Sequence, residues 1–273
     1  MSDRLRPQLY GIFGHPVAHS LSPVMHNAAF RHLEIEACYV PFDVADIEAG
    51  VQAVRTLDIR GVSITVPHKI SIMPYLDQID DAAAKIGAVN TVVNRDGVLT
   101  GTNTDGIGAV RALSEKGPIQ GKRVAVVGAG GAARAICFGV QSAGGEVTIF
   151  NRTVDRGRKL AEDLGCEFVP LSDIMQADTG IVVNATTVGM HPNSEKSPLP
   201  FEFLKPGMIV MDAVYSPLKT RLLEDAEARG CTQINGLHML IYQGAAQFEL
   251  WTGEKAPADL MLRAAEERRK PGR

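Results

Sequence analysis

The stretch that decides the fold is Val124-Ala-Val-Val-Gly-Ala-Gly-Gly-Ala-Ala-Arg134. It begins with an apolar, β-branched run that is typical of a fully buried strand. Gly128, Gly130 and Ala133 follow with the spacing G-x-G-x-x-G/A, and a helix is predicted over 132–140. A strand, a glycine turn and a helix in this order form the context that a dinucleotide-binding fingerprint requires.

Each small residue of this turn has a physical reason. Gly128 permits the sharp turn, Gly130 lets the backbone approach a pyrophosphate, and Ala133 lets the helix pack closely on the strand. The pyrophosphate would accept hydrogen bonds from the unpaired N–H groups at the helix N-terminus. The alternative is a glycine-rich turn without a ligand, but a second strand predicted over 146–150 favours the dinucleotide site. The predicted cofactor contacts here are Gly128, Ala129, Gly130, Gly131 and Ala132.

The end of the second strand predicts which dinucleotide binds. An NAD site has an Asp or Glu there, which accepts hydrogen bonds from the ribose 2′-hydroxyl. This strand ends in Phe150-Asn-Arg-Thr153, without an acid at its tip. A guanidinium can pair with a 2′-phosphate through two hydrogen bonds, so the sequence favours NADP. The alternative is a solvated helix start, where Asp155 weakens the positive field. The candidate contacts are Asn151, Arg152, Thr153 and Arg156.

Composition narrows the class of protein. A chain of 273 residues suits two domains, and 45% hydrophobic residues supply a sizeable core. The net charge of −3 gives no electrostatic basis for binding nucleic acid or an anionic membrane. No apolar run approaches a membrane span, and residues 1–6 lack the apolar region of a signal peptide. We therefore expect a cytoplasmic protein with a small-molecule substrate, either a monomer or a homodimer.

The cysteines and histidines do not predict a metal site. None of the four cysteines forms C-x-x-C, and they are expected to be small buried hydrophobes in a reducing compartment. The seven histidines include no H-E-x-x-H motif, so no metal is predicted. His15, His19 and His26 share a loop and a helix start, which favours structural roles.

The first part of the chain alternates strands and helices, which predicts a mostly parallel sheet with an antiparallel edge. Ser22-Pro23 is a helix start with Ser as N-cap and Pro at the first helical position. The turn Asn94-Arg-Asp-Gly97 predicts a hairpin. Strands are predicted over 8–14, 38–42, 61–66, 87–93 and 98–102, and helices over 22–34, 47–57 and 79–86.

The second part predicts a Rossmann-type domain. Its strands are predicted near 123–127, 146–150, 167–169, 181–183, 208–212 and 232–234. Helices over 105–116 and 218–229 accompany them, and the tail is predicted to form helices over 240–251 and 258–267 that return to the first domain. We therefore expect an α/β protein with two domains. Residues 1–104 plus 238–273 form the substrate-binding and catalytic domain and residues 105–237 the NADP-binding domain, with a cleft between them.

Hydride transfer by a nicotinamide cofactor requires a protein group that donates or accepts a proton. A nicotinamide cofactor moves a hydride and leaves the protein to handle the proton on the carbonyl or hydroxyl oxygen. Lys69 follows a predicted strand, and Asp105 begins a predicted helix in Asn103-Thr-Asp-Gly106. The alternatives are a solvated loop lysine and a helix N-cap, and spacing alone favours these alternatives.

A set of hydroxyls and amides accompanies this pair, and it suits a ligand with several hydroxyl groups. Its members are Ser20, Ser22, Thr65, Asn90, Asn184, Thr186, Tyr215 and Gln243.

At these residues the chain resembles the shikimate dehydrogenase family over nearly its full length. The matching stretches are His19-Ser-Leu-Ser-Pro23, Val62-Ser-Ile-Thr-Val-Pro-His-Lys69, Gly87-Ala-Val-Asn-Thr91, Gly101-Thr-Asn-Thr-Asp-Gly106, Gly128–Arg134, Asn151-Arg-Thr153, Asn184-Ala-Thr186, Asp212-Ala-Val-Tyr215 and Gly236-Leu-His-Met-Leu240 with Gln243-Gly244.

The resemblance implies reversible reduction of 3-dehydroshikimate to shikimate by NADPH, in aromatic amino-acid biosynthesis. It implies a catalytic pair, Lys69 and Asp105. It also implies that Ser20 and Ser22 hold the substrate carboxylate, and that Gly236 and Met239 border the nicotinamide. The residues implied to hold ring hydroxyls are Thr65, Asn90, Asp105 and Gln243.

Two alternatives to this reading stay open. The family includes NAD-preferring quinate/shikimate enzymes, which often carry an acid where this chain has Arg152. A nucleotide-binding regulator without catalysis is the other alternative, and intact Lys69 and Asp105 argue against it. Gly244 stands where an alanine is common in the family and is expected only to loosen local packing.

Overall fold

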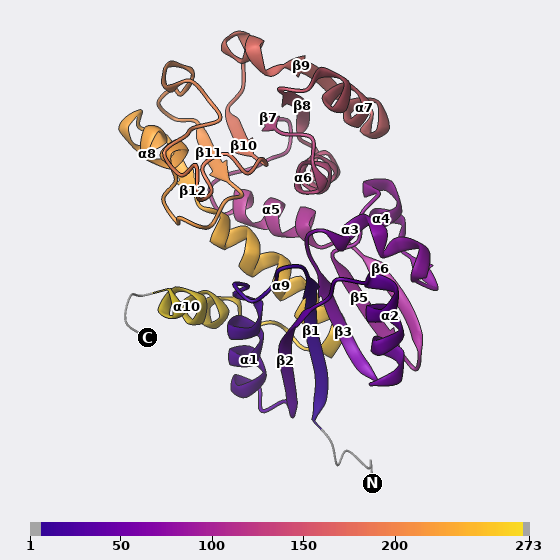
Figure 1. Cartoon of the computed structure of the whole chain (residues 1–273). Coiled ribbons are helices and arrows are strands. Elements are labelled where there is room, and N and C mark those ends of the chain that lie inside the picture. Colours follow the sequence, from indigo (N-terminus) through magenta and orange to yellow (C-terminus); the bar gives the residue numbers. More distant parts are fainter. Residues whose placement is uncertain (1–6, 270–273) are drawn as a thin grey trace. The chain divides into compact units, whose positions relative to one another are not determined.

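The computed structural model describes residues 7–269. The expectation about the first six residues therefore lies outside the described part of the chain. The chain divides into two compact units, each described below by itself (Figure 1). The first unit comprises Met1–Thr104 and Gly244–Arg273, and the second comprises Asp105–Gln243. The second unit thus includes residues 238–243, which the sequence-based division had placed with the first domain.

The first unit is built on one six-stranded sheet with the strand order β2-β1-β3-β5-β6-β4. Its elements in chain order are β1 (Gln8–Gly14), α1 (Ser22–His32), β2 (Ala37–Asp43), α2 (Ile47–Thr56), β3 (Ile59–Ile64), α3 (His68–Ser71), the 3-10 helix η1 (Met73–Tyr75), β4 (Gln78–Ile79), α4 (Asp81–Ile86), β5 (Thr91–Arg95), β6 (Val98–Thr102), the end of α9 (Gly236–Thr252) and α10 (Ala258–Arg268).

The expectation of an antiparallel edge is wrong. The antiparallel strand β5 lies inside the sheet, between β3 and β6. The hairpin at 94–97 places β6 outside β5, and the short strand β4 then pairs parallel to β6. The missed strand β4 has only two residues, which is too short to show an alternating pattern.

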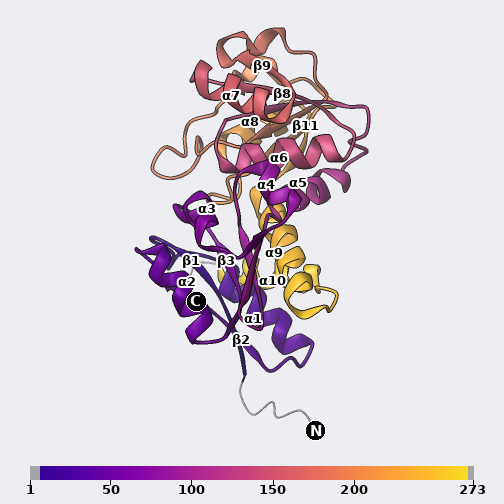
Figure 2. The same cartoon turned by 90° about the vertical axis from the view of Figure 1, so that its right-hand side faces the viewer.

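The two faces of this sheet are covered by different helices, as Figure 2 shows. Alternate residues of β1 point to opposite faces, as strand geometry requires. Tyr10 packs on Phe30 of α1 and on Trp251 of α9, with ring centroids 5.2 and 5.4 Å apart. Phe13, on the other face, belongs to a buried cluster with Val51 and Val54 of α2. The C-terminal helix α10 packs on α1, so the tail belongs to the core of the first unit.

Two local expectations in this unit are wrong, and one short helix was not expected. Leu21, not Ser22, is the N-cap of α1, because Ser22 already has helical geometry and lies at the first helical position. The strand predicted from residue 87 begins at Thr91, since Gly87 ends α4 in the left-handed region with φ +70°. The short helix α3, which contains Lys69, was not predicted.

The second unit is a fully parallel six-stranded sheet with the order β12-β11-β10-β7-β8-β9. This is the order of the doubly wound dinucleotide-binding fold, so the prediction of an α/β fold with a Rossmann-type sheet is confirmed. Its elements are α5 (Asp105–Ser114), β7 (Arg123–Val127), α6 (Gly131–Ser142), β8 (Glu146–Asn151), α7 (Val154–Leu164), β9 (Glu167–Pro170), the 3-10 helices η2 (Leu171–Gln176) and η3 (Phe201–Phe203), β10 (Ile181–Asn184), β11 (Ile209–Asp212), α8 (Arg221–Ala228), β12 (Thr232–Ile234) and the start of α9.

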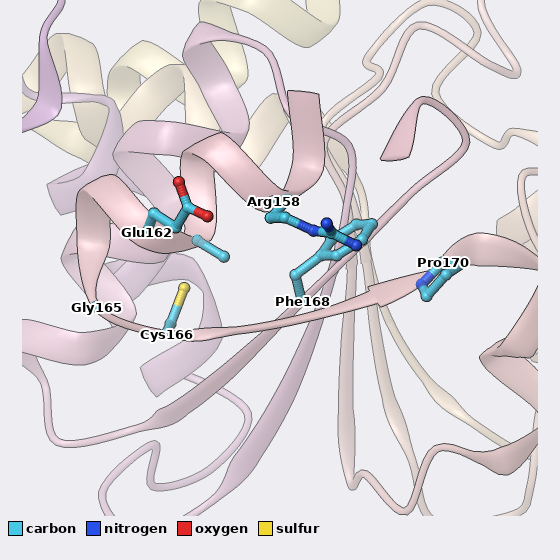
Figure 3. A pocket seen from close by; sticks show the side chains of 7 residues that line it. Arg158, Glu162, Gly165, Cys166, Phe168 and Pro170 are labelled. Carbon is cyan, nitrogen blue, oxygen red and sulfur yellow. The ribbon is translucent and has the colours of Figure 1, made fainter. Parts of the chain in front are cut away.

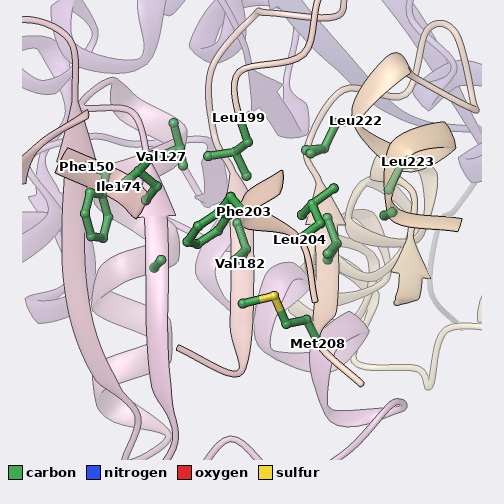
Figure 4. Close-up of a cluster of buried hydrophobic side chains, with 13 residues drawn as sticks. Val127, Phe150, Ile174, Val182, Leu199, Phe203, Leu204, Met208, Leu222 and Leu223 are labelled. Carbon is green, nitrogen blue, oxygen red and sulfur yellow. The ribbon is translucent and has the colours of Figure 1, made fainter. Parts of the chain in front are cut away.

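A buried apolar cluster holds α8 and the preceding loops against this sheet (Figure 4). Strand residues such as Val127 and Val182 meet Phe203 from η3 and Leu222 from α8. The near-continuous apolar strands follow from burial on both faces of a parallel sheet. This core leaves the carboxyl ends of the strands to carry polar residues.

The cysteine prediction holds for one residue only. Cys137 is buried, whereas Cys38 is exposed and Cys166 and Cys231 are partly exposed; all four are free thiols. Burial on the apolar side of α6 raises the pKa of the Cys137 thiol. In residues 7–269, no helix is both long and apolar enough to cross a membrane.

Candidate functional site

The glycine turn of the second unit lies between β7 and α6. Gly128 has φ +123°, a conformation that favours glycine, and its N–H donates to the Phe150 carbonyl at 2.8 Å. A Cβ on Gly128 would lie 3.1 Å from both the Ala185 oxygen and the Thr186 methyl carbon. The turn therefore packs closely against the residues that follow β10, and Thr186 lies beside it.

The next part of the turn is open. A Cβ on Gly130 or Gly131 would meet no protein atom within 4 Å. Gly130 is the N-cap of α6 and makes no side-chain cap, so the first N–H groups of the helix are left for another acceptor. Space, unpaired donors and the positive end of a helix dipole together suit a pyrophosphate.

The end of β8 lies next to this turn. Val127 of β7 and Phe150 of β8 are register partners, so the residues that follow both strands share one edge of the sheet. Asn151 donates to the Thr153 carbonyl at 2.7 Å and holds the chain in a turn. Arg152 and Arg156 are exposed and make no ion pair within residues 7–269. These two guanidinium groups fit a 2′-phosphate.

A buried polar hub supports the Thr186 loop, and the sequence reasoning did not identify it. The Thr186 hydroxyl donates to Asn184 Oδ1 at 2.7 Å, and Asn184 Nδ2 donates to Asp212 Oδ1 at 2.9 Å. The Thr220 hydroxyl donates to Asp212 Oδ2 at 2.6 Å. Burial raises the pKa of Asp212 to about 6 although three donors contact its carboxylate. An aspartate at the end of an apolar parallel strand was the available signal.

Asp105 begins α5 and is 6% exposed. A Cβ on Gly106 would lie 2.5 Å from the Ala135 carbonyl oxygen of α6, and one on Gly108 would lie 2.6 Å from the Met239 oxygen of α9. These glycines permit close helix packing, and they fix the backbone of Asp105 relative to the glycine turn.

The remaining predicted residues of the second unit lie on α9 or on the segment that follows β11. Gly236 starts this helix, and a Cβ there would lie 2.4 Å from the Ala213 oxygen. Met239 and Gln243 are buried on the helix, and Gln243 Nε2 donates to the Leu240 carbonyl at 2.9 Å. Tyr215 is partly exposed on the segment that follows β11.

In the first unit, the predicted substrate residues gather at the carboxyl end of β3. Thr65 follows this strand, and its N–H donates to the Phe13 carbonyl at 2.9 Å. The Ile64 N–H donates to the Asn90 carbonyl at 2.7 Å. Asn90 precedes the antiparallel strand β5, whose amino end therefore lies beside the carboxyl end of β3.

Lys69 and the serine loop reach the same end of the sheet. The Val89 N–H donates to the Lys69 carbonyl at 2.8 Å, which ties α3 to the segment before β5. The His15 N–H donates to the Val66 carbonyl at 3.1 Å and anchors the start of the loop. Within that loop Ser20 Oγ accepts from the Ser22 N–H at 3.2 Å. The predicted contacts are divided between the units. Ser20, Ser22, Thr65, Lys69 and Asn90 lie together in the first unit, whereas Asp105, Tyr215, Gln243 and all the predicted cofactor contacts belong to the second.

Sequence reasoning also missed a buried network behind Asn90. Gln247 of α9 is 1% exposed, and its Nε2 donates to Thr91 Oγ1 at 2.9 Å. The Thr91 hydroxyl donates to Asn90 Oδ1 at 2.6 Å. A glutamine four residues after Gln243, in an otherwise apolar stretch of helix, was the available signal.

The expectation for Gly244 is wrong. A Cβ at this position would lie 1.9 Å from the Met25 Cε atom, so the Met25 side chain already fills the space that an alanine would use. The packing is therefore tight. His26, next in the chain, is fully buried and stacks on Tyr39 at a centroid distance of 4.4 Å. Burial lowers the pKa of His26 to about 3, so the ring is neutral, consistent with a structural role.

A hollow of about 410 Å³ opens between α7 and β9 (Figure 3). Arg158 and Glu162 supply one charge of each sign, and Phe168 and Pro170 add apolar surface. The lining has none of the predicted contacts, and its opposed charges do not suit a phosphate. Residues 7–269 also contain no group of three or more potential ligand side chains arranged to hold a metal ion.

Comparison with known proteins identifies the family. Family models match residues 12–92 (shikimate dehydrogenase substrate binding domain), 111–193 (shikimate / quinate 5-dehydrogenase) and 236–266 (shikimate 5′-dehydrogenase C-terminal domain). A curated shikimate dehydrogenase (NADP(+)) from Moorella thermoacetica is 46% identical over 275 residues, covering 95% of this chain and 92% of the relative.

Two solved structures extend the comparison. Shikimate 5-dehydrogenase from Thermus thermophilus, in complex with NADP(H) and shikimate, is 41% identical with a TM-score of 0.90, covering 95% of this chain and 99% of that one. The Listeria monocytogenes enzyme, in complex with shikimate and NAD, is 42% identical with a TM-score of 0.89, covering 96% and 98%. The resemblance seen in the sequence motifs is confirmed, and the chain belongs to the shikimate dehydrogenase family.

Proposed function

We propose that the protein catalyses the reversible, NADPH-dependent reduction of 3-dehydroshikimate to shikimate in aromatic amino-acid biosynthesis. The observation that carries this proposal is the grouping of Ser20, Ser22, Thr65, Lys69 and Asn90 at one end of the first sheet, in a chain of this family. Hydroxyl and amide groups suit a polyhydroxylated acid, and the lysine supplies a proton carrier.

The cofactor proposal rests on the second unit. NADPH would supply the hydride when bound, with its pyrophosphate on the N-terminus of α6. The open space at Gly130 and the two exposed arginines after β8 support NADP rather than NAD. The proposed contacts are Gly128, Ala129, Gly130, Gly131, Ala132, Asn151, Arg152, Thr153, Arg156, Thr186, Gly236 and Met239.

The protein's own chemistry is proton transfer and orientation. Lys69 donates a proton to the substrate carbonyl oxygen as the hydride arrives, and takes it back in the reverse direction. Asp105 is proposed as its catalytic partner. Ser20 and Ser22, helped by Tyr215, hold the carboxylate through charge-assisted hydrogen bonds. Thr65, Asn90, Asp105 and Gln243 are proposed to hold the ring hydroxyls.

The first unit is thus proposed as the substrate-binding unit and the second as the NADP-binding unit. We also propose a cytoplasmic location, which four free thiols support, and a monomeric or homodimeric state.

An initial-rate assay tests the proposal. Purified protein is mixed with NADPH and 3-dehydroshikimate, and NADPH oxidation is followed while shikimate is identified by chromatography. We expect one shikimate formed per NADPH consumed. A folded protein that binds NADPH tightly and forms no shikimate would instead support the nucleotide-binding regulator.

A further inference from the structure

Two side chains of helix α9, Gln247 and Trp251, donate hydrogen bonds to strand β5 and to the residue before it, within the first unit. Gln247 Nε2 donates to the Asn90 carbonyl at 3.1 Å and to Thr91 Oγ1 at 2.9 Å. One turn later, Trp251 Nε1 donates to the Val92 carbonyl at 3.0 Å. Only Gln247 is linked, through the Thr91 hydroxyl, to the side chain of a proposed substrate residue, Asn90.

The orientation of the Gln247 amide is fixed from the other side. The Ser63 hydroxyl donates to Gln247 Oε1 at 2.7 Å, and the Tyr39 hydroxyl donates to Ser63 Oγ at 2.6 Å. Burial raises the pKa of the Tyr39 phenol, so this donor keeps its proton. Since Gln247 Oε1 accepts from Ser63, its Nε2 atom must face Thr91.

The Thr91 hydroxyl in turn orients the Asn90 side-chain amide. Thr91 Oγ1 accepts from Gln247, so its own proton goes to Asn90 Oδ1, 2.6 Å away. The Thr104 N–H donates to the same oxygen at 2.8 Å, and Asn90 Nδ2 donates to Thr104 Oγ1 at 3.0 Å. A flipped Asn90 amide would place its N–H groups against two buried donors, so the network permits one orientation.

We propose that Gln247 is a positioning residue for substrate recognition: through Thr91 it holds the Asn90 side-chain amide in one orientation. It thereby sets which Asn90 atom meets a ring hydroxyl. The inference deepens the proposed function and rests on it, because Asn90 is a proposed contact of the substrate. Gln247 itself lies behind Asn90 and acts only through it.

Gln247→Met tests this role, since methionine has similar length and no hydrogen-bonding amide. Steady-state kinetics should show a KM for shikimate raised about tenfold, with a smaller change in kcat. A tenfold change is what the loss of roughly one hydrogen bond to the substrate would cause. The Kd for NADP, measured by fluorescence titration, should stay unchanged.

Trp251→Phe is the matched control. It removes a partly buried hydrogen bond from the same helix to the same strand, but not one that is linked to the Asn90 side chain. We expect Trp251→Phe to lower the denaturation midpoint comparably while leaving the KM for shikimate within about twofold. If both variants raise this KM equally at equal loss of stability, Gln247 is merely structural and the inference is wrong.

Thr91 supplies a second, independent test that holds if Gln247→Met does not fold. Thr91→Val should reproduce the raised KM, and Thr91→Ser, which keeps the hydroxyl, should restore it. Equal KM values for the valine and serine variants would overturn the inference while the wild-type activity still supported the proposed function. A wild-type protein that does not turn over shikimate would remove both.

Discussion

The two units offer their proposed ligands different kinds of group. In the second unit the proposed cofactor meets mainly backbone: an open glycine turn, the uncapped start of α6 and two exposed arginines. In the first unit the proposed substrate meets side chains, and Asn90 among them is oriented by a buried chain of hydroxyls and amides.

The two kinds of site tolerate amino-acid substitutions differently. A backbone site depends on conformation and on the absence of Cβ atoms, so substitution of a single glycine damages it. A side-chain site depends on partners further back in the core, so residues without ligand contact can alter it. Substitutions at the glycine turn of the second unit and at the side chains of the first should therefore affect cofactor and substrate separately.

The largest expected effect comes from Lys69→Ala in the first unit. Loss of a positioned proton carrier typically lowers kcat by about a hundredfold or more. The Kd for NADP should not change, because the proposed cofactor contacts belong to the second unit. Lys85→Ala removes an exposed lysine of the same unit and serves as control. A near-normal kcat in folded Lys69→Ala protein would remove Lys69 from the mechanism.

Arg152→Asp tests the second unit's cofactor preference. The substitution removes a partner of the 2′-phosphate and adds a repelling carboxylate, so the NADP-to-NAD ratio of kcat/KM should fall about ten- to a hundredfold. Arg158→Asp makes the same charge change on the wall of the hollow in Figure 3 and should leave the ratio nearly unchanged. An unchanged KM for NADP in Arg152→Asp would show that the phosphate is bound elsewhere.

Alanine substitutions at Gly128 and Gly130 distinguish two requirements of the glycine turn: its backbone conformation and the space that it leaves for the ligand. Gly128→Ala forces a side chain into φ +123° beside the Ala185 oxygen, and it should lower the free energy of unfolding by about 1–3 kcal/mol. Gly130→Ala meets no protein atom within 4 Å, so it should leave stability nearly unchanged. It should still weaken NADP binding about tenfold by displacing the pyrophosphate. Chemical denaturation and fluorescence titration measure the two effects. Unimpaired NADP binding in Gly130→Ala would contradict the proposed pyrophosphate site.

Much of the second unit follows from local pattern. The strand Arg123–Val127, its glycine turn and the helix after it agree with the prediction because the determinants lie within a dozen consecutive residues. The start of the short strand β5 was misplaced because Gly87, a left-handed helix end, resembles the start of an apolar strand.

The Gln247 network could not be predicted in the same way. Its partner Ser63 lies 184 positions away in the chain, and no local pattern indicates which buried hydroxyl meets which amide. Tertiary contacts of this kind also decide that Met25 fills the space at Gly244.

The smallest expected effects are two pH dependences of opposite sign, one in each unit. The folded pKa of His26 is lowered to about 3 from 6.5, so its contribution to stability is present above pH 6.5 and is lost as pH falls. The folded pKa of Asp212 is raised to about 6 from 3.8, so its contribution is present below 3.8 and is lost as pH rises through 6.

When the pH falls from 7 to 5, the free energy of unfolding should therefore decrease by about 2 kcal/mol because of His26 and increase by about 1 kcal/mol because of Asp212. Urea unfolding at both pH values measures the change. His26→Phe should reduce the acid loss, and Asp212→Asn should increase it. Equal pH dependence in the wild type and both variants would contradict these assignments.

The proposed substrate-binding role of the first unit and NADP-binding role of the second are tested most directly by measuring kcat/KM for shikimate and quinate, each with NADP and with NAD. Quinate carries an extra hydroxyl at the carbon bearing the carboxylate. Leaving it buried and unpaired near Ser20 and Ser22 would cost roughly 1–3 kcal/mol, about ten- to a hundredfold in kcat/KM. We predict that shikimate with NADP exceeds every other combination by at least tenfold. Comparable efficiency with quinate, or with NAD, would contradict the account and favour an NAD-linked quinate/shikimate dehydrogenase.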